Sequence, residues 1–390
     1  MNWLHRQVTA RPSALALQSA EQALNWSNLG TRVRRVAAAL RGVGVQPNDR
    51  VAVLIEDNLQ FAVTILAVGW LGATLIPLNR RLTDGEISWI LQDIDPHLLV
   101  IDHTAGTRNI ELADKPFVQV NELTLSLDCE PVDVDEHGVA VIMYTSGTTG
   151  PPKPVPLTWE NIKASAAASA FNIGVHRDDV WLCVIPLYHI GGLSILYRGV
   201  LYGTATLILD RFDAGEVIAM LPRVTIVSLV PTMLHRLIQA GMEKQTDSRV
   251  RAVLLGGGPA DQDAIAWCTA RGLPVLQTYG MTEACSQVTT MPIDAVNDLP
   301  VDSPRWASAG LPVLGATISI RSSASQTVPA HTLGNIFVRG PMVTHGYLDR
   351  PTENSRRFVD GWFDTGDFGY VDEQGYLYVK VAGMTSLSQG

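Results

Sequence analysis

The 390-residue sequence has few charged residues and few cysteines, and both shortages exclude classes of protein. Lysine and arginine together number 29 against 38 acidic residues, and no basic run is present, so we expect no nucleic-acid partner. The four cysteines form no Cys-x-x-Cys pair and no zinc-ligand spacing, which is typical of thiols that stay free in a reducing compartment. The first residues, 1–6, lack the apolar stretch of a signal peptide, and we therefore expect a cytoplasmic protein.

Only one long apolar run resembles a membrane span. Residues 61–77 are nearly all apolar, but Gly69 and Gly72 interrupt the run and Pro77 ends it. This pattern predicts a helix, a glycine break and a short buried strand, because a bilayer helix needs about 20 uninterrupted apolar residues. We therefore expect no membrane span.

The order of the remaining segments indicates the fold class. From Val51 to Arg271, strand-length and helix-length segments alternate, and the strands are apolar on both faces. This predicts α/β architecture with two helix-covered, mostly parallel sheets, interleaved over residues 1–303. After about Pro304 the pattern changes to β segments with Gly, Pro and Ser turns, which predicts a small β-rich lobe over 304–390. Residues 104–137 are weakly patterned, and we interpret them as a connecting region.

The most informative motif follows an apolar run, 139–143, that we expect to form a buried strand. It reads Tyr144-Thr145-Ser146-Gly147-Thr148-Thr149-Gly150-Pro151-Pro152-Lys153. Hydroxyls and backbone N–H groups are the donors that a polyphosphate needs, and glycines let the backbone approach it closely. The Walker A spacing is absent. A turn of this composition could by itself be an ordinary flexible loop.

The order of residues in this motif resembles the phosphate-binding signature of the adenylate-forming superfamily, which contains acyl- and aryl-CoA ligases, luciferases and peptide-synthetase adenylation domains. Three further segments, 256–259, 278–283 and 362–367, resemble other signatures of that family. The four motifs stand in the family's order, and the resemblance covers the chain from about residue 26 to 380, so the chain is identified as the large N-terminal body of such an enzyme.

The resemblance implies a two-step reaction. The family joins a carboxylate to ATP, which releases pyrophosphate and leaves an acyl-adenylate, and then passes the acyl group to a thiol, usually that of CoA. Positioning and electrostatic stabilisation supply most of the catalysis in such phosphoryl chemistry. The implied partners are a small-molecule carboxylic acid, ATP and CoA, with Mg²⁺ as the cofactor.

The resemblance also assigns roles on the nucleotide side. Thr148, Thr282 and Glu283 are expected to act at the reacting phosphates, and Glu283 is the expected magnesium ligand, because a hard cation prefers oxygen. The other expected contacts with the nucleotide are Thr145, Ser146, Gly147, Thr149, Gly150, Lys153, Gly256, Gly257, Gly258, Pro259, Thr278, Tyr279, Gly280, Met281 and Asp367. Of these, Tyr279 is expected to stack on adenine and Asp367 to accept from the ribose hydroxyls.

Each of these residues also has a structural interpretation. Lys153 could be solvated, Tyr279 could be a core aromatic, and Glu283 could complement a helix dipole. Asp367 could form an Asx-turn within its Thr-Gly-Asp sequence. The phosphate loop and Glu283 are nevertheless expected to bind the same triphosphate.

The choice of acid is expected to depend on residues 186–198. His189 matches the family residue that lines the acyl pocket, and Ser194 and Arg198 lie four positions apart on a predicted helix, so they share a face. This segment and the run 280–288, which contains Ser286, resemble the o-succinylbenzoate–CoA ligase family of menaquinone biosynthesis. That substrate has two carboxylates, and an arginine can grip the second one bidentately. Alternatively, Arg198 is an ordinary surface residue.

Several positions depart from the family pattern. Pro154 and Asn335 stand where glycine and glutamate are usual, and residues 381–385 lack the family's Gly-Arg-x-x-Asp hinge. The given sequence ends at Gly390, and we expect the family's mobile C-terminal domain, with its catalytic lysine, to be missing from it. We therefore expect a fragment of a longer ligase, a naturally short relative, or a body whose lid is a separate chain. Two other functions stay open. The chain could be a ligase for another aryl or acyl acid, or a relative that binds a nucleotide or acyl-adenylate without turnover.

Overall fold

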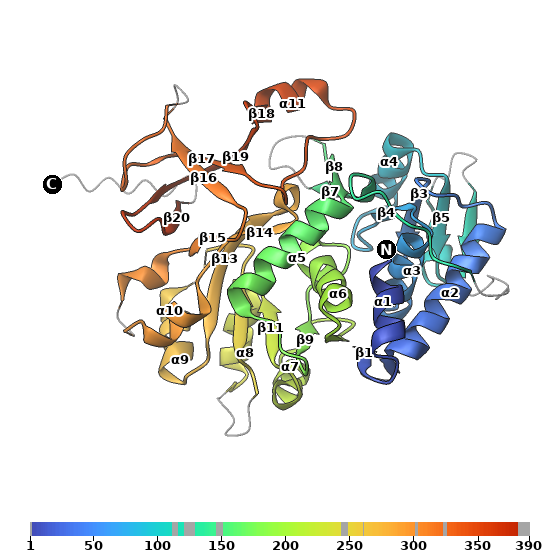
Figure 1. The fold of residues 1–390 in the computed structure, drawn as a ribbon, viewed down its shortest axis with the longest axis horizontal. Coiled ribbons are helices and arrows are strands. Elements are labelled where there is room, and N and C mark those ends of the chain that lie inside the picture. The colour runs from blue at the N-terminus through green and yellow to red at the C-terminus, as the bar shows by residue number, and fades with distance from the viewer. Residues whose placement is uncertain are drawn as a thin grey trace. The chain divides into compact units, whose positions relative to one another are not determined.

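The computed structural model describes residues 2–110, 116–120, 129–145, 151–242, 249–259, 261–300, 303–322 and 326–380. It divides into two compact units. The first comprises residues 1–163 and 176–211, and the second comprises 164–175 and 212–390. Helix α5 (Trp159–Ile173) begins in the first unit and ends in the second. We describe each unit by itself (Figure 1).

The first unit contains a six-stranded sheet in the order β6-β5-β3-β4-β7-β8. Its strands are parallel except for the hairpin that β7 forms with β8. The bounds are β3 (Arg50–Leu54), β4 (Thr74–Pro77), β5 (Leu98–Ile101), β6 (Phe117–Gln119), β7 (Val139–Thr145) and β8 (Lys153–Thr158). Four more strands of this unit follow the order β9-β10-β1-β2, with β1 (Leu15–Gln18), β2 (Ala23–Asn25), β9 (Val180–Cys183) and β10 (Ala205–Ile208).

The helices of the first unit are α1 (Trp3–Ala10), α2 (Trp26–Gly42), α3 (Asn58–Trp70), α4 (Asp84–Ile94) and α6 (Ile190–Tyr202). Helix α3 is buried almost all round, which explains its nearly continuous apolar sequence. A left-handed turn at Gly72 (φ +67°) separates α3 from the buried strand β4, as the glycine break in the sequence predicted. Within the described residues, no helix is both long enough and apolar enough to cross a bilayer.

The second unit begins with βα alternation and ends in antiparallel strands. Its first sheet has the order β15-β14-β13-β12-β11, in which β11, β12 and β13 are parallel. The bounds are β11 (Ile226–Leu229), β12 (Ala252–Leu255), β13 (Val275–Met281), β14 (Ser286–Thr290) and β15 (Leu311–Pro312). The helices are α7 (Ala214–Met220), α8 (Pro231–Gln239), α9 (Gln262–Ala270) and α10 (Ile293–Asp298).

The last strands of the second unit form a five-stranded antiparallel sheet, in which β16, β17, β19 and β20 lie side by side (Figure 1). The bounds are β16 (Thr317–Arg321), β17 (Gly334–Arg339), α11 (Pro351–Arg357), β18 (Phe358–Val359), β19 (Trp362–Val371) and β20 (Leu377–Lys380). The prediction of mostly parallel sheets with helices, followed by a β-rich segment, is therefore confirmed.

One local prediction is wrong. Residues 104–137 are not only a connection, because β6 within them pairs in parallel with β5. This strand has three residues, and its Phe117 is 52% exposed, so it shows no apolar pattern. Strand β8 is not predicted by the sequence, because Pro154 and Pro156 lie within it.

Candidate active site

The glycine turn Gly256–Gly258 lies next to the end of β13 that carries the motif residues 278–281. Both lie at the carboxyl ends of the parallel strands of the second unit. The turn follows β12, and β13 is the parallel neighbour of β12. A Cβ atom on Gly256 would lie 2.8 Å from Cγ2 of Thr278, so only glycine allows this approach. Gly257 has φ +82°, which also favours glycine. Ligands of open α/β sheets bind at the carboxyl ends of the parallel strands, where these residues lie.

Tyr279 and Asp367 are joined by a hydrogen bond across two elements. The Tyr279 hydroxyl on β13 donates to Oδ2 of Asp367 on β19 at 2.7 Å. Burial, and then the negative charge of Asp367, raise the pKa of Tyr279 well above its ordinary value. The phenol therefore stays protonated and continues to donate. The Asp367 carboxylate is exposed, which leaves it accessible to hydroxyl groups of a ligand.

The Asx-turn interpretation of Asp367 is wrong. Oδ1 of Asp364 accepts from the Gly366 N–H at 3.0 Å, so Asp364 forms the turn. The Asp367 N–H donates to Oγ1 of Thr365 at 3.1 Å, and that hydroxyl donates to the Ile336 carbonyl of β17. Two side chains thus fix the backbone of the segment and leave the Asp367 carboxylate to Tyr279 and to ligands.

Glu283 lies in the 3-10 turn Thr282–Ala284 that follows β13. Its Oε1 accepts from the Tyr347 hydroxyl at 2.8 Å, and its backbone carbonyl accepts from the Thr344 N–H at 2.7 Å. The turn has three residues and no long helix follows it, so the interpretation of Glu283 as a complement to a helix dipole is wrong.

The surroundings of Glu283 fit a hard divalent cation bound together with a ligand. A half-buried carboxylate offers the oxygen donors that Mg²⁺ prefers. Among the described residues, no three His, Cys, Asp or Glu side chains gather into a metal cluster. Proteins commonly bind Mg²⁺ through one or two carboxylates plus the phosphates of the substrate, and Glu283 suits that arrangement.

The connection from Glu283 to β14 is unusually tight. Cys285 and Ser286 both have positive φ (+49° and +97°), which is rare for residues other than glycine. Gly280 lies so close to this connection that a Cβ atom there would be 1.6 Å from the Ser286 carbonyl oxygen. Ser165 of α5, which the sequence did not indicate, donates to the Cys285 carbonyl at 2.6 Å. These contacts fix where Thr282, Glu283 and Ser286 lie.

The phosphate-binding motif lies partly outside the described residues. Thr145 ends β7 and stands opposite Lys153, the first residue of β8, in the antiparallel register. Ser146, Gly147, Thr148, Thr149 and Gly150 are not described. Thr145 and Lys153 are both half-buried, and they place the two ends of the motif on neighbouring strands of the first unit.

The acyl-pocket candidates of the first unit belong to α6 and the turn before it. His189 is the N-cap residue of α6, and its ring lies 4.8 Å from the Tyr188 ring. Although the residue is exposed overall, the loss of water around the ring, and then the positive charge of Arg81, hold the pKa of His189 below its ordinary value. The imidazole is therefore neutral at neutral pH.

Arg198 is not a surface residue. It is 3% exposed, and its guanidinium carbon lies 5.5 Å from the centroid of the Trp181 ring on β9. Ser194, one helical turn earlier, is also buried, and its hydroxyl donates to the Gly191 carbonyl at 3.2 Å. A guanidinium removed from water interacts more strongly with a carboxylate than an exposed one does.

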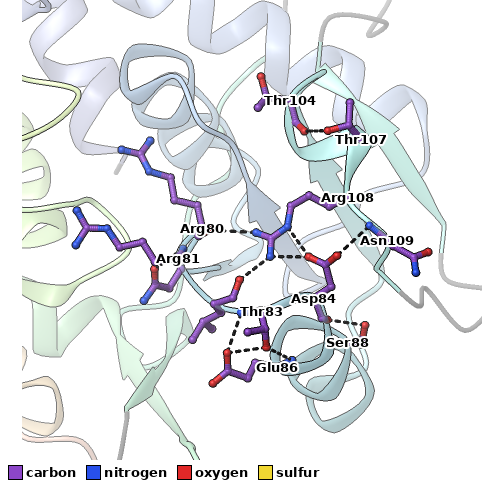
Figure 2. A network of polar contacts seen from close by, with 12 residues as sticks. Arg80, Arg81, Thr83, Asp84, Glu86, Ser88, Thr104, Thr107, Arg108 and Asn109 are labelled. Carbon is purple, nitrogen blue, oxygen red and sulfur yellow. Dashed lines mark hydrogen bonds and ion pairs between the residues drawn. The ribbon is translucent and has the colours of Figure 1, made fainter.

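An arginine network supports the turn that carries His189, and the sequence did not predict it. The Arg80 guanidinium carbon lies 6.0 Å from the centroid of the Tyr188 ring, and Arg80 also donates to the Asp210 carbonyl at 2.8 Å. Figure 2 shows Arg108 pointing at Asp84 and at the backbone of residues 80–82. Arg108 donates through Nε to Asp84 at 2.7 Å, so it fixes the segment from which Arg80 and Arg81 extend.

Comparison with known proteins gives consistent matches. The AMP-binding enzyme family matches residues 4–348. The 2-succinylbenzoate–CoA ligase of Bacillus mycoides (strain KBAB4) is 36% identical over 380 residues, which are 97% of this chain and 77% of that protein. A solved structure of o-succinylbenzoate CoA synthetase (MenE) from Bacillus subtilis, in complex with the acyl-adenylate OSB-AMP, matches with TM-score 0.89 and 33% identity, over 97% of this chain and 77% of that one. The same enzyme in complex with ATP and a magnesium ion matches with TM-score 0.87 and 33% identity, over 97% and 78%.

Proposed function

Because this chain belongs to the AMP-binding enzyme family, we propose that it activates 2-succinylbenzoate with ATP and transfers the acyl group to CoA. The observation that carries the proposal is 36% identity, over 97% of the chain, to a curated 2-succinylbenzoate–CoA ligase. The likeness to the structure with bound OSB-AMP supports the same substrate.

The reaction consists of two displacements. In the first, a carboxylate oxygen of the acid attacks the α-phosphorus of ATP, the bond to the β-phosphate breaks, and pyrophosphate leaves. In the second, the CoA thiolate attacks the acyl carbon of the adenylate, and AMP leaves with the electron pair of the broken C–O bond. Positioning of the reactants and stabilisation of the charge on the phosphates are the main tasks of the protein.

The second unit supplies candidates for the nucleotide. We assign the adenine to the Gly256–Pro259 turn and to the ring of Tyr279, with Thr278, Gly280 and Met281 forming the strand beside it. Asp367 accepts from the ribose hydroxyls, and its hydrogen bond to Tyr279 orients it for that role. Thr282 donates to the α-phosphate. Glu283 would hold Mg²⁺, which when bound neutralises charge on the phosphates.

The first unit supplies candidates for the acid and for the end of the triphosphate. Thr145 and Lys153, with the hydroxyls and glycines of residues 146–150, bind the phosphates. His189 lies beside the carboxylate that reacts, and its lowered pKa keeps the imidazole neutral. A neutral ring is needed there because an imidazolium would pair with the carboxylate and reduce its nucleophilicity. Buried Arg198 binds the second carboxylate, with Ser194 on the same face of α6.

Isotope exchange between pyrophosphate and ATP tests the first displacement. We expect exchange that requires both 2-succinylbenzoate and a divalent cation, and calorimetric binding of both ATP and the acid. Exchange with a monocarboxylic aryl acid at the same rate would instead support a ligase for another acid. Binding of ATP and 2-succinylbenzoate without exchange would support the interpretation as a relative without turnover, and absence of binding would reject the family role for this chain.

The cellular location is part of the proposal. Each of the four cysteines is buried and free. Burial raises the pKa of both Cys183 and Cys268 to about 12, so these thiols are inert. CoA and ATP are cytoplasmic substrates of biosynthetic enzymes, and we place the reaction in the cytoplasm.

A further inference from the structure

Tyr347 is buried against Glu283, and the roles assigned above make no use of it. The residue is 5% exposed, and its hydroxyl donates to Oε1 of Glu283 at 2.8 Å. The ring packs edge-on against Phe358 and Phe363, with centroid distances of 5.8 Å and 6.5 Å. A tyrosine with so little rotational freedom presents its hydroxyl at one fixed point.

The backbone of Tyr347 is held by Asn354 of α11. The Tyr347 N–H donates to Oδ1 of Asn354 at 2.7 Å, and Nδ2 of Asn354 donates to the Tyr347 carbonyl at 2.8 Å. The residue before Tyr347 is Gly346, with φ +154°, and a Cβ atom there would lie 3.0 Å from the Asn354 amide. One side-chain amide therefore fixes both polar groups of the Tyr347 backbone.

The same segment also fixes the backbone of Glu283. The Thr344 N–H donates to the Glu283 carbonyl at 2.7 Å, three residues before Tyr347. Residues 344–347 thus contact Glu283 at its main chain and at its side chain. Among the residues that the structure describes, Tyr347 is the one hydrogen-bond donor to the Glu283 carboxylate, so the second oxygen, Oε2, is left for a ligand.

In this contact the Tyr347 hydroxyl is the donor and the Glu283 carboxylate is the acceptor. The hydroxyl therefore holds Oε1 of Glu283 from one fixed position.

We propose that Tyr347, anchored by Asn354, is the positioning residue that orients the Glu283 carboxylate toward a divalent cation. This inference depends on the proposed role of Glu283 as the magnesium ligand. Partners that orient metal ligands through hydrogen bonds commonly contribute 10- to 100-fold, in order of magnitude, to metal affinity or activity. The contribution arises because the carboxylate is held in one rotamer before the cation arrives.

The test measures the ATP affinity of the wild type and of each variant by calorimetry, once with Mg²⁺ and once with a chelator. The ratio of the two affinities is the gain that Mg²⁺ brings, and this gain is compared between the proteins. We expect Tyr347→Phe to reduce this gain by roughly tenfold while ATP binding in the chelator stays as in the wild type. The half-saturating Mg²⁺ concentration for pyrophosphate exchange should rise by a similar factor. Asn354→Ala should shift both quantities in the same direction, because it frees the backbone of Tyr347.

A matched control is available in the same unit. The Tyr378 hydroxyl donates to Oδ2 of Asp372 at 3.3 Å, so Tyr378→Phe removes the same kind of tyrosine–carboxylate contact. This variant should leave the Mg²⁺-dependent gain unchanged. Urea unfolding of all variants separates a loss of stability from a loss of metal affinity. A Tyr347→Phe protein with the wild-type gain, whatever its stability, would overturn the inference.

A further variant distinguishes failure of this inference from failure of the proposed function. Glu283→Gln should abolish the Mg²⁺-dependent gain if Glu283 is the metal ligand. If Glu283→Gln loses the gain and Tyr347→Phe keeps it, the positioning role alone is rejected. If Glu283→Gln keeps the gain, the metal-ligand assignment itself is rejected, and the role of Tyr347 is rejected with it.

Discussion

The hydroxyl of Tyr279 donates to the carboxylate of Asp367 across 88 positions of the sequence, at 2.7 Å. This contact joins the residue proposed to stack on adenine to the residue proposed to accept from ribose. The two therefore form one preassembled surface for a nucleoside, and a change in one is expected to affect the other.

We predict that Tyr279→Phe weakens ATP binding only moderately, because the ring remains and a single hydrogen bond to the exposed Asp367 carboxylate is lost. A contact of this kind contributes about 1 kcal/mol, which is roughly a fivefold change in the dissociation constant. Asp367→Ala should weaken binding more, since it also removes the ribose acceptor. Calorimetry with ATP measures both variants. Equal affinities for the wild type and Asp367→Ala would exclude Asp367 from the nucleotide site.

Arg198→Leu should weaken 2-succinylbenzoate far more than an aryl monocarboxylate. Loss of a hydrogen-bonded charge from a buried pair costs about 2–5 kcal/mol, which corresponds to at least a thirtyfold rise in the dissociation constant of the dicarboxylate. The control is Arg321→Leu, which removes another arginine that lies on aromatic rings, those of Phe337 and Trp362. Equal weakening of both acids by Arg198→Leu would reject recognition of the second carboxylate.

Gly280→Ala should destabilise the second unit strongly. The new Cβ atom would lie 1.6 Å from the Ser286 carbonyl oxygen, so the hairpin of β13 and β14 must open. Overpacking against backbone of this severity should cost more than about 3 kcal/mol of unfolding free energy. Gly85→Ala, in the first turn of α4, meets no atom within 4 Å and should be neutral or slightly stabilising. Urea unfolding followed by circular dichroism compares the two, and similar midpoints would contradict the geometry.

Protonation of His189 should lower the free energy of unfolding in acid. Its pKa is lowered in the folded state from an ordinary value of 6.5, mainly by loss of water and further by Arg81, so the unfolded chain binds a proton more readily. Protonation therefore favours unfolding as pH falls below 6.5 toward the folded-state pKa, and has no effect above 6.5. Relative to His189→Asn, the wild type should lose unfolding free energy over that window and keep a constant difference above it. A constant difference at every pH would show that the pKa is not shifted.

The sequence predicts most helices and the parallel strands of this fold because their signals are local. Pro231 marks the first turn of α8, and the buried strand β12 is a continuous apolar run over Ala252–Leu255. The hairpin of β13 and β14 is different. Its residues are rich in hydroxyls and include Gly280, and the pairing of β13 with β12 and of β14 with β15, rather than local pattern, makes them strands.

The same distinction applies to the candidate site. Tyr279, Glu283 and Asp367 could be named from their motifs, but the contacts between them and their partners could not. The hydrogen bond from Tyr347 to Glu283 spans 64 positions, and no pattern in the sequence links the two residues. Burial of Arg198 likewise depends on packing against Trp181, which local sequence does not reveal.

The prolines of β8 affect the tendency of this protein to aggregate at high concentration. In the order of the described strands, β8 ends the six-stranded sheet of the first unit, and Pro154 and Pro156 stand opposite Tyr144 and Ile142 of β7. Prolines tolerated in a ladder have the missing N–H turned away from the partner strand. A strand of another protein molecule that paired with β8 at this edge would lack two backbone N–H donors. The two prolines therefore oppose aggregation by strand pairing there.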